Sequence, residues 1–141
     1  MQTYSNMKNR HLFLLVVVLC GLASCKARAP LTTTNFSTHG FVQDEAGERL
    51  QGIAIVTAVD DFGRTDTVYT NATGEFYSRM QKVPYPIPRV TVTAIDLNGE
   101  YLQQSVSPHY MYECGVGFVP EKDCAFTEDI IFTLLNPVRC K

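Results

Sequence analysis

The chain has 141 residues, with 12 basic and 14 acidic side chains and a formal net charge of −2 at pH 7. This length fits one domain. Loss of residues 1–24, which contain two basic residues and no acidic one, would leave 10 basic against 14 acidic side chains (12 − 2 = 10). An acidic domain of this kind argues against nucleic-acid binding, because phosphates require basic patches.

Residues 1–24 predict a secretory leader rather than part of the fold. Lys8, Arg10 and His11 form a basic start, and Leu12–Leu19 is an unbroken apolar run. A membrane-spanning helix needs about 20 apolar residues to cross about 30 Å of hydrocarbon, so this run is too short. A positive start, a short apolar middle and a small-residue end are typical of a signal peptide.

The leader ends in Leu-Ala-Ser-Cys at Leu22–Cys25, which resembles the lipobox of bacterial lipoproteins. The resemblance implies cleavage before Cys25, a diacylglycerol on its sulfur and an acylated amino group. Several acyl chains together anchor a protein firmly. The alternative is an ordinary secretory signal with a coincidental cysteine. Lys26 stands where relatives carry an inner-membrane retention aspartate, which implies the outer membrane, facing the periplasm. The sequence leaves open a start at Met1 or Met7.

Residues 25–37 are polar and Thr-rich after the cysteine, and we expect them to be a flexible tether. Residues 38–141 then predict strands and turns, because helical periodicity is absent and turn residues recur at short intervals. The expected strands are His39–Asp44, Gly52–Val59, Asp66–Thr70, Glu75–Met80, Arg89–Asp96, Tyr101–Ser107 and Ile130–Leu135 within a last segment 128–135.

Seven such strands predict a β-sandwich of transthyretin or Ig-like type. Asn98-Gly99 is a strong hairpin signal after the fifth strand. The segment Val83–Pro88 cannot pair as a regular strand, since each proline lacks an N–H. The expected core consists of Val42, Ile53, Ile55, Val68, Phe76, Val90, Val92, Ile130, Phe132 and Leu134.

The stretch from His39 to Met80 resembles the carboxypeptidase regulatory-like module. The matching positions are Gly40, Val42, Gly47, Leu50, Gly52, Ile53, Thr70, Gly74 and Phe76. The resemblance implies a transthyretin-like sandwich that serves as an accessory domain without catalytic residues of its own. With the lipobox and tether, the whole chain is similar to small Bacteroidota lipoproteins, including a group associated with radical SAM enzymes.

Three cysteines, Cys114, Cys124 and Cys140, remain once Cys20 leaves with the leader and Cys25 is lipidated. Outside the cytoplasm, one disulfide and one leftover thiol is the simplest outcome. The loop 108–127 favours Cys114–Cys124, and Cys124–Cys140 is the rival pairing.

Catalytic motifs are absent from the sequence, so it predicts a protein that is not an enzyme and needs no cofactor or metal. Two weak metal alternatives exist. Zinc could use His109 with the three cysteines, and calcium could use Asp60, Asp61 and Asp66. Asn71-Ala72-Thr73 matches a glycosylation acceptor, and a simple turn is the alternative.

An aromatic group borne on loops is the remaining candidate for function. It consists of Tyr85, His109, Tyr110, Tyr112 and Phe118. These rings could form a binding surface, or they could cap one end of the sandwich. The sequence thus predicts a lipid-anchored, non-catalytic accessory module that holds a protein or glycan partner at the envelope. The alternatives are an adhesin or pilin-like subunit whose last strand pairs with a neighbour, and a Cys/His metal protein.

Overall fold

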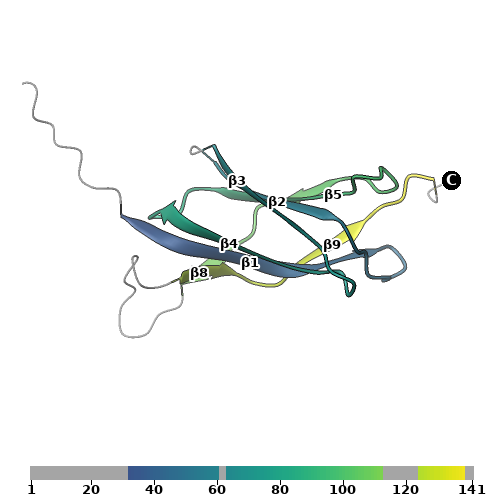
Figure 1. Cartoon of the computed structure of the whole chain (residues 1–141), viewed down its shortest axis with the longest axis horizontal. Helices are drawn as coiled ribbons and strands as arrows, with labels where there is room; N and C mark the ends of the chain where they lie inside the picture. Colours follow the sequence, from purple (N-terminus) through teal and green to yellow (C-terminus); the bar gives the residue numbers. More distant parts are fainter. Residues whose placement is uncertain (1–31, 61–62, 113–123, 139–141) are drawn as a thin grey trace, which may run out of the picture. The chain divides into compact units, whose positions relative to one another are not determined.

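The computed structural model of the protein describes residues 32–60, 63–112 and 124–138 (Figure 1). Within these ranges the chain is all-β, with nine strands and no helix. Accordingly, no helix of the described part is long and apolar enough to cross a membrane. The strands are β1 (Thr33–Asp44), β2 (Ala54–Val59), β3 (Arg64–Tyr69), β4 (Glu75–Pro84), β5 (Val90–Ile95), β6 (Gln104–Val106), β7 (Tyr110–Tyr112), β8 (Cys124–Thr127) and β9 (Ile130–Leu134).

The strands form two sheets that lie as two layers (Figure 1). One sheet has the order β4-β1-β8-β7, and β9 also pairs with β1; the other has the order β3-β2-β5-β6. The predicted β-sandwich is therefore confirmed, but the count of seven strands is wrong. The strands β7 and β8 lie inside the predicted loop 108–127, and they have only three and four residues, too few for an alternating pattern to be recognised.

β1 is longer than predicted, and this corrects the tether. The strand begins at Thr33 instead of His39, so residues 33–37 belong to the sheet. The side chains of Thr34 and Phe36 are buried, with exposed fractions of 2% and 0%. Threonine suits a half-buried pleated surface, so the Thr-rich composition that predicted a flexible segment belongs instead to a strand.

β4 also extends beyond its predicted end at Met80. Val83 and Pro84 pair with Thr34 and Thr33 after a register shift in which β4 has one extra residue, three steps from Met80 to Val83 against two from Thr34 to Phe36. Proline is tolerated here because β4 is at the edge of its sheet, where a missing N–H leaves no inner strand without a partner.

The core lies between the two sheets and contains all ten predicted residues. Nine of them are buried, and Val68 is partly buried against the cluster. Seven further residues belong to this core without having been predicted: Phe36, Val59, Met80, Val83, Ile87, Ala94 and Ala125. Two of them, Phe36 and Val83, come from the segments of β1 and β4 that lie outside the predicted strands.

The predicted turns hold as expected. Gly47 and Gly74 take positive φ values of 82° and 73°, which favour glycine. After β5, the carboxylate of Asp96 accepts hydrogen bonds from the backbone N–H of Asn98 and Glu100. This turn joins β5 to β6, a hairpin shorter than predicted because β6 covers only Gln104–Val106.

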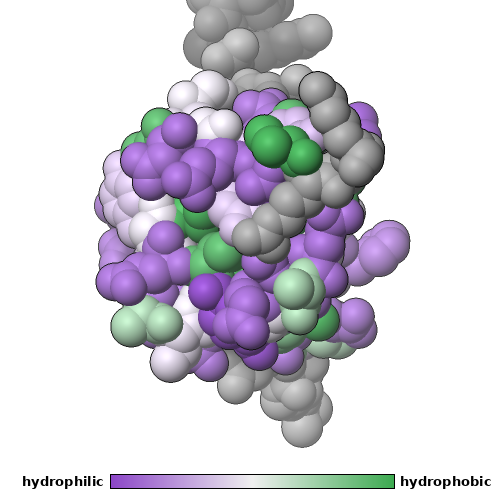
Figure 2. Space-filling view, turned by 90° about the vertical axis from the view of Figure 1, so that its right-hand side faces the viewer, coloured by the Kyte–Doolittle hydropathy of each residue, from purple (hydrophilic) through white to green (hydrophobic). Residues whose placement is uncertain are grey.

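The end of the sandwich that carries the β5–β6 turn and the residues after β9 is mainly hydrophilic (Figure 2). Leu97, Leu102, Leu135 and Val138 are its exposed hydrophobic side chains. Single apolar residues on a polar surface are ordinary, so this end carries no functional inference. The predicted leader 1–24, Cys25 and the tether up to residue 31 lie outside the described residues.

Candidate functional site

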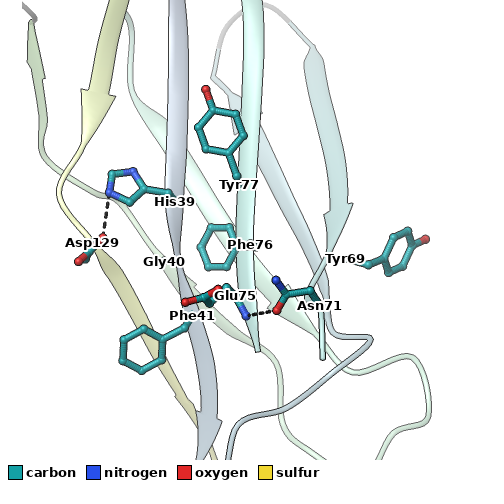
Figure 3. Close-up of a pocket in the computed structure, with 9 residues that line it drawn as sticks. All are labelled: His39, Gly40, Phe41, Tyr69, Asn71, Glu75, Phe76, Tyr77 and Asp129. Carbon is teal, nitrogen blue, oxygen red and sulfur yellow. Dashed lines mark hydrogen bonds and ion pairs between the residues drawn. The ribbon is translucent and has the colours of Figure 1, made fainter. Parts of the chain in front are cut away.

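An open depression of about 470 Å³ lies on the outer face of the first sheet. We call it the His39 depression. Residues from β1 and β4 line it, together with residues at the end of β3 and just before β9 (Figure 3). The lining residues are His39, Gly40, Phe41, Tyr69, Asn71, Glu75, Phe76, Tyr77 and Asp129.

The pairing of β1 with β4 sets the polar and aromatic side chains of this face. His39 lies opposite Tyr77, and Phe41 lies opposite Glu75. Side chains alternate between the two faces of a strand. Because Phe76 points into the core, its neighbours Glu75 and Tyr77 point outward, as the exposed positions of β4 show.

An irregularity between β8 and β9 brings Asp129 to the same face. Both strands pair in parallel with β1, Phe126 opposite Ser37 and Ile130 opposite Gly40. The segment from Phe126 to Ile130 therefore takes four steps where β1 takes three (130 − 126 against 40 − 37). One extra residue reverses the alternation of faces, as in a β-bulge, so Phe126 and Asp129 both face outward.

Gly40 allows β9 to lie close against β1 at this point. A Cβ atom at Gly40 would lie 1.9 Å from the carbonyl oxygen of Ile130. Only a residue without a side chain fits such an approach. The neighbour of Ile130, Asp129, is thereby held beside His39, the neighbour of Gly40.

His39 and Asp129 form an ion pair or a hydrogen bond, according to the protonation of the imidazole. The distance from His39 Nε2 to Asp129 Oδ1 is 2.8 Å (Figure 3). A carboxylate that accepts from Nε2–H fixes the neutral tautomer whose Nδ1 is an acceptor. The side chains are 40% and 71% exposed, so a ligand in the depression can reach them. The pair can accept and hold a proton.

One exposed tyrosine ring lies beside the pair, that of Tyr77, which is opposite His39 in the sheet; Tyr69 also lines the depression, but its ring points away from the pair (Figure 3). Tyr77 and Tyr69 are 61% and 59% exposed. Exposed rings of this kind offer flat surfaces on which a planar ligand can stack.

The turn before Glu75 is organised by Asn71. Its Oδ1 accepts hydrogen bonds from the backbone N–H of Thr73 and Glu75. The predicted Asn71-Ala72-Thr73 sequon therefore forms a turn, the alternative that the sequence left open. This turn leads directly into Glu75, the first residue of β4. The Thr73 hydroxyl donates a hydrogen bond to Glu75 Oε2 at 3.0 Å.

The predicted aromatic group is brought together in part. The ring centroids of Tyr85 and Tyr112 are 5.6 Å apart, and those of Tyr110 and Tyr112 are 5.8 Å apart. The Tyr110 hydroxyl donates to the carbonyl of Ile87 at 2.6 Å, and Tyr110 and Tyr112 pack against the core. Burial, with the neighbouring Tyr110 and Tyr85, raises the pKa of Tyr112.

These rings show the packing expected of a cap, and none of them lines the His39 depression. His109 is exposed next to the group, whereas Phe118 lies outside the described residues. Their use as a binding surface stays a prediction.

The predicted cysteine chemistry is described only at Cys124. Its half-buried side chain carries a free thiol, and Sγ donates to the carbonyl of Ala125 at 3.3 Å. Cys114 and Cys140 lie outside the described residues, so the disulfide pairing stays a prediction.

Metal ligands do not gather in the described part of the chain. Ranges 32–60, 63–112 and 124–138 contain no group of three or more His, Cys, Asp or Glu side chains that could hold an ion. The zinc alternative needs Cys114 and Cys140, and the calcium alternative needs Asp61, all outside these ranges. Asp66 accepts a short hydrogen bond from the hydroxyl of Ser78, which occupies one of the proposed calcium ligands.

The sequence does not predict the site found in the structure. His39 and Asp129 are 90 positions apart (129 − 39), and nothing local links them. The one available signal was Gly40, which adjoins His39 and is one of the positions at which the sequence resembles the carboxypeptidase regulatory-like module.

Comparisons with known proteins support the fold. No protein-family model and no curated protein matches the chain. Among solved structures, 3-chlorocatechol 1,2-dioxygenase from Rhodococcus opacus 1CP is similar at 13% identity and a TM-score of 0.52, over 77% of this chain and 62% of that one. The dioxygenase domain of a dioxygenase carbohydrate-binding fusion from Streptomyces sp. SirexAA-E is similar at 15% identity and a TM-score of 0.46, over 76% and 84%.

This finding overturns two predictions, that the chain is a non-catalytic accessory or binding module and that it is not an enzyme. Both depended on an accessory-type sandwich, and the same sandwich occurs in a dioxygenase. At 13% identity the likeness shows the fold alone, and the chain spans about three fifths of that enzyme's length. β9 pairs with β1 along one edge, and the adhesin or pilin-like alternative stays a prediction.

Proposed function

We propose that the protein binds a phenolic ring compound in the His39 depression and takes a proton from its hydroxyl onto His39. The observation that carries the proposal is the 2.8 Å contact between His39 Nε2 and Asp129 Oδ1 in a depression beside the exposed ring of Tyr77. A histidine oriented by a carboxylate is an effective general base.

The chemistry of the proton transfer favours a phenol. The hydroxyl O–H bond breaks, an N–H bond forms at His39 Nδ1, and a phenolate remains on the ligand. Asp129 stabilises the resulting imidazolium from the Nε2 side. A phenolic hydroxyl ionises near pH 10, several units more readily than an aliphatic hydroxyl, so histidine can compete for its proton.

The ring of such a ligand also suits the walls of the depression. Tyr77 can stack on it, and Glu75 can accept a hydrogen bond from a second hydroxyl. The solved structure with the higher TM-score acts, by its name, on a chlorocatechol, a ring with two adjacent hydroxyls. That likeness supports the choice of ligand class.

We do not propose that this protein carries out the reaction with dioxygen that the name of that enzyme indicates. Reactions of dioxygen need a metal or another cofactor. His39, Glu75 and Asp129 line the depression, but the described residues contain no group of three such side chains placed to hold an ion together. The described residues therefore do not fit a metal centre, and we derive no oxidative step.

The test uses 4-nitrocatechol, whose visible absorption changes when it ionises. We expect the wild-type protein to bind it and to raise the ionised fraction near neutral pH. His39→Gln should abolish this spectral change, and Asp129→Asn should reduce it several-fold, because the imidazolium loses its partner.

Two matched controls lie nearby. His109→Gln alters the other exposed histidine, which does not line the depression, and Glu128→Gln alters the neighbour of Asp129. Both variants should behave as wild type. Equal spectral changes in the His39→Gln and wild-type proteins would refute the proton transfer.

We also propose the finer fold type and the location that the sequence suggests. The transthyretin-like, carboxypeptidase regulatory-like type is supported by Gly47 and Gly74, which have positive φ at the motif's turn positions. A lipid anchor at Cys25 in the outer membrane, facing the periplasm, is supported by the leader pattern and Leu-Ala-Ser-Cys. Kinship with small Bacteroidota lipoproteins is proposed on the same motifs.

A further inference from the structure

A second depression, also of about 470 Å³, adjoins the first on the outer face of the same sheet. We call it the Arg79 depression. It shares His39 and Tyr77 with the His39 depression, so the two form one continuous strip along β4 and β1. Its lining residues are Ser37, His39, Tyr77, Arg79, Cys124 and Phe126.

The strip has opposite charges at its two ends. Glu75 and Asp129 line the His39 depression, which contains no Arg or Lys. Arg79 lines the other depression, which contains no Asp or Glu. In the described part of the chain, the contact of His39 with Asp129 is the one ion pair present, so the guanidinium of Arg79 has no carboxylate partner there.

The register of the sheet sets the spacing between the residues of the Arg79 depression and His39. Glu75, Tyr77 and Arg79 alternate outward along β4, and residues two apart on a strand are about 7 Å apart. Arg79 lies opposite Ser37, and Ser37 lies opposite Phe126. The backbone positions of Arg79 and Phe126 thus lie about one such step along the sheet from His39 and its partner Tyr77.

We infer that the ligand of the His39 depression carries an anionic group on a short side chain, which Arg79 binds. The inference rests on the proposed function and names its ligand class: a phenol with a carboxylate about 7 Å from the hydroxyl that donates to His39. Arginine donates from a planar fork that matches a carboxylate. The apolar part of the ligand's side chain would lie across Tyr77 and Phe126.

The test compares three catechols that differ in the charge of their side chain. They are 3-(3,4-dihydroxyphenyl)propanoate, its neutral amide and the cationic 2-(3,4-dihydroxyphenyl)ethylamine. Each competes with 4-nitrocatechol for the wild-type protein and for the Arg79→Gln and Arg79→Glu variants. Arg89→Gln, an exposed arginine that lines neither depression, is the matched control.

We expect Arg79→Gln to weaken binding of the propanoate by about two- to fivefold, the range of an exposed charge pair, and to leave the amide unchanged. Arg79→Glu should reverse the preference, so that the cation binds better than the anion. Equal effects on all three ligands, or none, would overturn this inference alone. Failure of 4-nitrocatechol to bind the wild type would overturn the proposed function and the inference with it.

Discussion

At the scale of single residues, Gly40 controls both packing and the site. A Cβ atom there would overlap the carbonyl oxygen of Ile130, so Gly40→Ala must push β9 away from β1. We expect the free energy of unfolding to fall by about 3 kcal/mol, as for a severe overpacking change. Because Asp129 moves with β9, the spectral response to 4-nitrocatechol should disappear as well.

Gly47→Ala is the control for this change. Gly47 has a φ of 82° and no atom within 4 Å of its would-be Cβ, so alanine there meets only backbone strain of about 1–2 kcal/mol. Urea unfolding measures both variants. A Gly40→Ala protein that keeps wild-type stability and response would contradict the close packing of β9.

Tyr112 makes stability depend on alkaline pH. Burial raises its pKa in the folded protein, whereas the unfolded chain ionises near the usual value of about 10. The stabilisation is complete below the unfolded pKa and is lost as pH rises through the higher folded pKa. Urea unfolding from pH 8 to 11 measures this effect. We expect the free energy of unfolding to fall less steeply with pH for Tyr112→Phe than for wild type.

The control for this titration is Tyr69→Phe, since Tyr69 is exposed and lies outside the tyrosine cluster. It should retain the wild-type slope of stability against pH. Parallel slopes for all three proteins would show that Tyr112 does not carry the effect.

At the scale of elements, substitutions in the first half of β1 can distinguish a strand from a flexible tether. Phe36 is fully buried, and its ring lies edge-on to Tyr110 at 5.9 Å. Phe36→Ala should therefore cost about 3–5 kcal/mol of unfolding free energy, measured by urea unfolding. Asn35→Ala, on the opposite face of the strand, should cost much less. A tether would tolerate both changes equally.

The strands that could be predicted are those with a local signal. β2, β5 and β9 have continuous or alternating apolar patterns, and Asn98-Gly99 marks the turn after β5. β7 and β8 are too short for any such pattern, because a strand of three or four residues contains at most two inward positions. Their place comes from pairing with a distant strand.

The site depends even more on distant pairing. β8 and β9 both pair with β1, and the extra residue between them turns Asp129 to the outer face. A one-residue change in register moves every following side chain to the other face. The sequence contains Glu128 and Asp129 but no sign of which one would face His39.

At the scale of the whole molecule, the β-sandwich could be predicted from composition and turn spacing. The chemical groups at its site could not. Many sequences with regular turns and apolar strands build two packed sheets, and such a fold is used by enzymes and non-enzymes alike. The absence of known catalytic motifs therefore could not exclude catalysis. A pair such as His39 and Asp129 becomes visible only when the sheets are assembled.

The predicted lipid anchor at Cys25 would hold this domain at a membrane. β1 begins at Thr33, so seven residues separate it from Cys25 (33 − 25 − 1), and they span at most about 25 Å when extended. We expect labelled palmitate to enter the wild type and not Cys25→Ala, and the variant to move from the membrane to the soluble fraction. The variant should keep its response to 4-nitrocatechol, because Cys25 precedes the sandwich. Equal labelling of both proteins would refute the anchor and leave the His39 depression untouched.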